Sequence, residues 1–70
     1  MDAQTEFARE IEQFLSDTGM SPTRFGKRAV GDPAFVFKIR KGRDVTLGTA
    51  EKVRLFMRTE IGAANERRAS

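Results

Sequence analysis

The chain has 70 residues, which suits one small domain, and it contains neither cysteine nor histidine. These absences exclude disulfides, thiolate or imidazole metal sites, and nucleophiles activated by histidine. No Asp/Glu cluster has the spacing of a calcium loop, and no apolar run approaches the about 18 residues of a membrane span. The N-terminal stretch, MDAQTEFARE, is acidic and polar rather than a signal peptide. We therefore expect a cytoplasmic protein with no membrane partner, no cofactor and no small-molecule ligand.

Charge is distributed unevenly along the chain, although the net charge is only +3. Residues 1–20 carry a net charge of −4, residues 21–43 a net charge of +6, and residues 44–70 a net charge of +1. A basic block in the middle of a small domain indicates where a polyanion would bind, while a merely solvated face remains the alternative.

The first half of the chain predicts two helices. Apolar residues recur every three or four positions over residues 5–15, and Gly19 is expected to end that helix. Ser21 and Pro22 then form a capping hydroxyl and a proline suited to the first helical position. The second helix, residues 22–29, is anchored by Phe25, and Gly26 within it indicates close approach of another backbone.

The second half predicts two more helices. Asp32 is expected to cap a third helix over residues 33–41, which ends at Gly42. Thr46 is expected to cap a last helix that reaches residue 59 or 61 and is broken by Gly62. Its predicted apolar face comprises Leu47, Ala50, Val53, Phe56 and Met57. The prediction is an all-α bundle of four to five short helices, with a domain over residues 1–62 and a frayed tail over residues 63–70.

The helices at 22–29 and 33–41 are separated by about three residues that include a glycine, and the second is basic. This arrangement is typical of a helix-turn-helix. Residues 21–57 resemble the helix-turn-helix of the lambda repressor and Cro-like (XRE-like) family. The residues that carry the resemblance are Ser21, Phe25, Gly26, Ala29, Val30, Gly31, Asp32, Val36, Ile39, Gly42, Thr46, Leu47, Val53 and Met57. Two features depart from that family: the turn reads Val-Gly rather than Gly-Val, and the third helix has no Gln, Asn or Ser.

The resemblance implies a nucleoid-associated, bacterial or phage transcription regulator that binds DNA with the third helix in the major groove and the second across the backbone. Repression is the usual case in the family, and activation stays open. The resemblance also implies a homodimer on a near-palindromic duplex site, with half-sites about 34 Å apart. We expect the dimer surface on the last helix, at Leu55, Phe56 and Ile61, or on the acidic first helix.

The third helix has two faces at 100° per residue. Phe35, Val36 and Ile39 form the predicted core face, whereas Phe37 lies opposite them. Expected base contacts are Pro33, Ala34, Phe37, Lys38 and Lys41, with Phe37 and Ala34 meeting thymine methyl groups. Expected phosphate contacts are Ser21, Thr23, Arg24, Lys27, Arg28, Arg40 and Arg43. Two alternatives for Phe37 stay open: a rolled helix that buries its ring at the core rim, and a dimer or partner surface.

Other functions are also considered. A protein-interaction module of the same fold, antitoxin-like or a co-regulator, would use Phe35 or Phe37 as an anchor and bind little or no DNA. RNA binding is a further alternative, although the chain shows no sheet-type aromatic platform. We do not expect an enzyme, because no general acid/base pair stands out.

Overall fold

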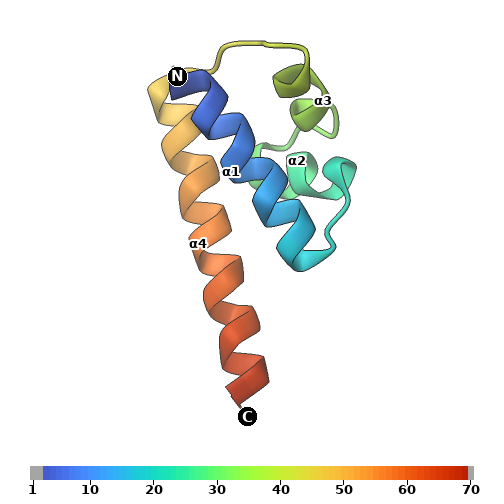
Figure 1. The fold of residues 1–70 in the computed structure, drawn as a ribbon, viewed down its shortest axis with the longest axis vertical. Helices are drawn as coiled ribbons and strands as arrows, with labels where there is room; N and C mark the ends of the chain where they lie inside the picture. The colour runs from blue at the N-terminus through green and yellow to red at the C-terminus, as the bar shows by residue number, and fades with distance from the viewer. Residues whose placement is uncertain (1–2, 70) are drawn as a thin grey trace.

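The computed structural model describes the backbone of residues 3–69 and the side chains of residues 5–61. All regular elements within residues 3–69 are helices: α1 (Ala3–Thr18), α2 (Pro22–Val30), α3 (Phe35–Arg40) and α4 (Leu47–Ala69). Helix α1 crosses α4, and the two short helices lie together beside α1, with an extended connection leading from α3 to the start of α4 (Figure 1). The predicted all-α class with four helices is therefore confirmed.

Helix α1 forms because its apolar residues make one stripe along it. Phe7, Ile11, Phe14 and Leu15 are all buried, while the acidic side chains between them stay exposed. Gly19 ends the helix as predicted: its φ is 71°, and its N–H donates to the Leu15 carbonyl at 2.9 Å. The helix extends slightly beyond the predicted range at both ends.

Helix α2 has the predicted start and a well-defined end. The Ser21 hydroxyl accepts a hydrogen bond from the Arg24 N–H at 3.1 Å, and Pro22 occupies the first helical position. Gly31, with a φ of 74°, donates its N–H to the last free carbonyls of the helix, those of Gly26 and Lys27.

Three phenylalanines from three helices meet in the core. The ring of Phe25 lies 5.4 Å from Phe14 and 5.5 Å from Phe56, edge-to-face in both pairs. Such pairs contribute about 0.5–1.5 kcal/mol beyond the area that they bury. Val36 and Val53 are fully buried beside them, so α1, α2, α3 and α4 share a single core.

The prediction for the start of α3 is wrong in detail. The α-helix begins at Phe35 rather than at Pro33, because residues 33–34 form a turn. The Asp32 carboxylate accepts the Ala34 N–H at 2.9 Å, and the Asp32 carbonyl accepts the Phe35 N–H at 3.1 Å. Asp32 thus stabilises the turn that leads into α3 instead of capping the helix directly.

Helix α4 differs from its prediction in length and at its first residue. Thr46 caps it as expected, accepting the Thr49 N–H at 3.2 Å. Leu47, however, is 74% exposed and does not join the core. The predicted break at Gly62 is wrong, since the helix continues to Ala69 and its last turns project beyond the other helices (Figure 1). Glycine disfavours a helix by only about 1 kcal/mol and keeps its N–H, so a helix can pass through it.

Candidate nucleic-acid interface

Helices α2 and α3 are held against each other at Gly26. A Cβ atom added there would overlap the Asp32 carbonyl oxygen and lie 3.0 Å from the Phe35 Cβ. The Gly26 carbonyl also accepts the Asp32 N–H at 3.1 Å. The close approach predicted from this glycine is confirmed, and it leaves no room for α3 to shift toward α2.

The two faces of α3 are as predicted. Phe35, Val36 and Ile39 are between 0% and 6% exposed, whereas Phe37 is 43% exposed. The alternative in which the helix rolls and buries Phe37 in the core is therefore wrong. An exposed phenylalanine on a helix whose other face is fixed is available for contact with another molecule.

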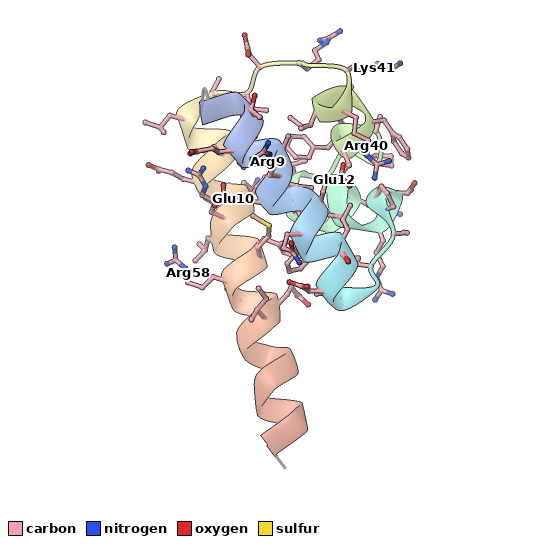
Figure 2. All side chains as sticks on the ribbon, in the orientation of Figure 1. Arg9, Glu10, Glu12, Arg40, Lys41 and Arg58 are labelled. Atoms are coloured by element: carbon pink, nitrogen blue, oxygen red, sulfur yellow. The ribbon has the colours of Figure 1, made fainter. Side chains whose placement is uncertain are left out.

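Arg40 connects Phe37 to α1. Its Nε and Nη2 donate to the two carboxylate oxygens of Glu12 at 2.7 and 2.9 Å, and its guanidinium lies 5.7 Å from the Phe37 ring centroid. Hydrogen bonding to Arg40 lowers the pKa of Glu12, and the same contact raises the pKa of Arg40. Figure 2 shows Arg40 close to Glu12, with Lys41 at the loop end of α3 and directed away from the bundle. Arg40, an expected phosphate contact, thus has a partner within the chain.

Two more of the expected DNA contacts form ion pairs. Lys38 Nζ lies 2.8 Å from the Asp32 carboxylate and lowers its pKa, to which the Ala34 N–H also contributes. Arg28 Nη2 lies 2.8 Å from the Glu60 carboxylate, and its guanidinium lies 5.4 Å from the Phe56 ring centroid. Contact of these side chains with phosphate would require exchange of a carboxylate for the phosphate.

The other expected cationic contacts are exposed. Among the side chains of residues 5–61, none forms an ion pair or hydrogen bond with the side chains of Arg24, Lys27 or Lys41. Arg43 follows Gly42, whose φ is 90°, and its backbone N–H donates to the Lys38 carbonyl at 3.1 Å. This bond and a second from Gly42 N–H to the Ile39 carbonyl at 2.9 Å close the end of α3.

The remaining expected contacts lie at the two helix starts. Ser21 and Thr23 are exposed at the start of α2, where the Ser21 hydroxyl already caps the helix. Pro33 is exposed and Ala34 half-buried in the turn before α3. The start of a helix favours anions, although Pro22 has no N–H and Ser21 already accepts the N–H groups of Arg24 and Phe25.

Sequence reasoning missed the acidic partners of these cations. Glu12 lies 28 residues from Arg40 in the sequence, and Glu60 lies 32 residues from Arg28. A further pair joins Arg54 to Glu10 at 2.8 Å, 44 residues apart. No local pattern identifies such pairs, because they depend on which helices come to lie side by side.

Within the described residues, no group of three or more acidic side chains could hold a metal ion, and no helix is long and apolar enough to cross a membrane. Comparison of the chain with protein-family models, with curated proteins and with solved structures gave no match. The functional interpretation therefore depends on the chain itself.

Proposed function

We propose that the chain is a sequence-specific regulator that binds duplex DNA, with α3 entering the major groove and α2 lying across the phosphate backbone. The observation that carries this proposal is the two-sided character of α3. Its Phe35, Val36 and Ile39 are buried, while its Phe37 and the adjacent Lys41 are exposed. Repression by blocking polymerase follows from the resemblance to Cro-like proteins.

Electrostatics supports the same orientation. Arg24 and Lys27 on α2, and Lys41 just after α3, are exposed cations without a partner among the described side chains. Each cation that neutralises a phosphate releases a counterion, which favours association. Phosphate contacts of this kind set the register of a protein on DNA, while groups on α3 would read the bases.

We further propose that two copies bind a two-fold symmetric site. A groove of about 590 Å³ runs between α1 and α4, and Phe14, Met57 and Ile61 contribute its apolar lining. Ile61 is 42% exposed at this groove. Arginine and acidic side chains line the same groove, and mixed charge on one patch allows it to pair with its own copy. Phe56 is a weaker candidate than expected, because it is half-buried under Arg28.

Selection from a random duplex library, followed by titration of variants, tests the proposal. The wild type should enrich a motif with two-fold symmetry. Lys41→Ala should weaken binding to all duplexes and reduce the salt slope by about 0.9. Lys52→Ala is the matched control, since Lys52 is an exposed lysine on α4 outside the proposed contacts, and it should bind like the wild type. Equal binding by both variants would contradict the placement of α3.

One observation favours the alternative function, a protein-interaction module of the same fold. Arg28, Lys38 and Arg40 are neutralised within the chain, which weakens the field that would attract DNA. In that case Phe37→Ala should abolish capture of a protein partner, while Lys41→Ala should leave it unchanged.

A further inference from the structure

We infer that Phe37, held in place by Arg40 and Glu12, reads the C5-methyl group of a pyrimidine in the major groove. This inference rests on the proposed DNA-binding function and names the chemical group that would give it sequence specificity. Thymine and 5-methylcytosine both carry this methyl group at the same ring atom, whereas cytosine and uracil lack it.

Phe37 differs from the other exposed apolar side chains. Leu47, Leu55 and Ile61 are also exposed, but they are aliphatic and lie on α4, whereas Arg40 stacks on the aromatic ring of Phe37. Phe37 lies on the outer face of α3, about 160° round the helix from the buried Phe35 and Ile39 and about 100° from Val36. The part of the ring that the chain leaves exposed is available to a group that enters from outside the fold.

The ring of Phe37 is braced by a second helix. Arg40 stacks on it at 5.7 Å, and both oxygens of the Glu12 carboxylate on α1 hold the guanidinium. A two-point contact between a guanidinium and a carboxylate fixes orientation as well as distance. Because Glu12 neutralises Arg40, this part of the surface is suited to an apolar contact rather than to a phosphate.

Within α3, guanine could be read by Lys38 or Arg40, but both of these side chains form ion pairs within the chain. The segment FVFKIR has no amide or hydroxyl side chain, so it cannot make the paired hydrogen bonds that recognise adenine. The methyl group of a pyrimidine is the one apolar feature of the major groove edge, so it is the group that a braced phenyl ring would contact.

Replacing single thymines by uracil in the selected duplex tests the inference, because it removes only the methyl group. Burying one methyl-sized group is worth about 0.8 kcal/mol, so we expect about fourfold weaker binding at one position per half-site. The same replacement should have no effect on the binding of Phe37→Ala. Uniform insensitivity of the wild type to uracil, or an equal loss in Phe37→Ala, would overturn the inference while leaving DNA binding intact. Failure to bind any duplex would remove the proposed function and the inference together.

A second comparison identifies the source of the methyl group. At the uracil-sensitive position, the T·A pair is replaced by C·G with and without methylation of the cytosine. We expect methylation of the cytosine to raise the affinity about fourfold in the wild type and not in Phe37→Ala. This result would show that the ring accepts the methyl group of either pyrimidine, so that methylation of DNA would regulate binding. No gain on methylation restricts the contact to thymine.

The brace has its own test. In Glu12→Gln, the ratio of the affinities for the thymine and uracil duplexes should fall from about four towards one. The slope of log K against log salt should become steeper, because Arg40 becomes free to contact phosphate. Glu10→Gln is the matched control: it removes the same charge from α1 but breaks the contact with Arg54 instead. A ratio that is unchanged in Glu12→Gln, or lowered equally in both variants, would show that Glu12 and Arg40 do not position the ring.

Discussion

For the substitution Gly26→Ala, helix propensity and the structure predict opposite changes in stability. Propensity alone predicts stabilisation by about 1 kcal/mol, because alanine is the better helix former. In the structure, however, the added Cβ would overlap the Asp32 carbonyl oxygen and crowd the backbone of Phe35. Neither neighbour is the flexible end of a side chain, so α2 and the turn before α3 would have to separate.

The expected magnitude follows from these two terms. Overpacking of this kind costs up to about 3 kcal/mol, which after the gain in propensity leaves a net loss of about 2 kcal/mol. For a domain of this size, such a loss corresponds to a Tm lower by about 8–16 °C. Thermal and urea unfolding followed by circular dichroism would measure it.

Gly48→Ala is the matched control for this experiment. Gly48 is in the first turn of α4, and a Cβ added there meets nothing within 4 Å. The substitution Gly48→Ala should leave the free energy of unfolding unchanged or raise it by up to about 1 kcal/mol. A Gly26→Ala protein at least as stable as the wild type would refute the close packing of α2 against the turn.

Two other predictions concern stability. Phe25→Ala should lower the free energy of unfolding by about 3–5 kcal/mol because Phe25 is fully buried, whereas Phe37→Ala should lower it by less than about 1 kcal/mol, and urea titration would distinguish them. Contact with Arg40 lowers the pKa of Glu12 from its ordinary value of 4.5, and Lys38 lowers that of Asp32 from 3.8. The folded state therefore gains stability above these values and loses it as pH falls through the lowered ones, so Glu12→Gln should show a weaker loss of stability below about pH 4 than the wild type.

The features that the sequence predicted correctly depend on local chemistry. Ser21 with Pro22 identifies the start of α2, and Gly19 and Gly31 each end a helix with a positive φ. The spacing of apolar residues identified the buried face of α3, because Phe35, Val36 and Ile39 lie on one side of a helix and are buried together.

The errors and omissions depend on tertiary structure. Leu47 has the right spacing for the core, but it is the first residue of α4 and is 74% exposed. Gly62 does not end α4, since glycine within a run of helix formers disfavours but does not stop a helix. The candidate interface was predicted as a set of cations, but the partners of Arg28 and Arg40 come from helices distant in sequence.

The salt dependence of duplex binding tests the central claim most directly. Arg24, Lys27 and Lys41 are exposed and have no carboxylate partner among the side chains of residues 5–61, and three such cations predict a slope of log K against log salt of about −2.7 per subunit. The paired cations add less, because a carboxylate that is released takes up a counterion again. Between 50 and 200 mM salt, binding should then weaken by roughly 40-fold per subunit. A binding constant that does not change over this range would contradict the assignment of this surface to DNA.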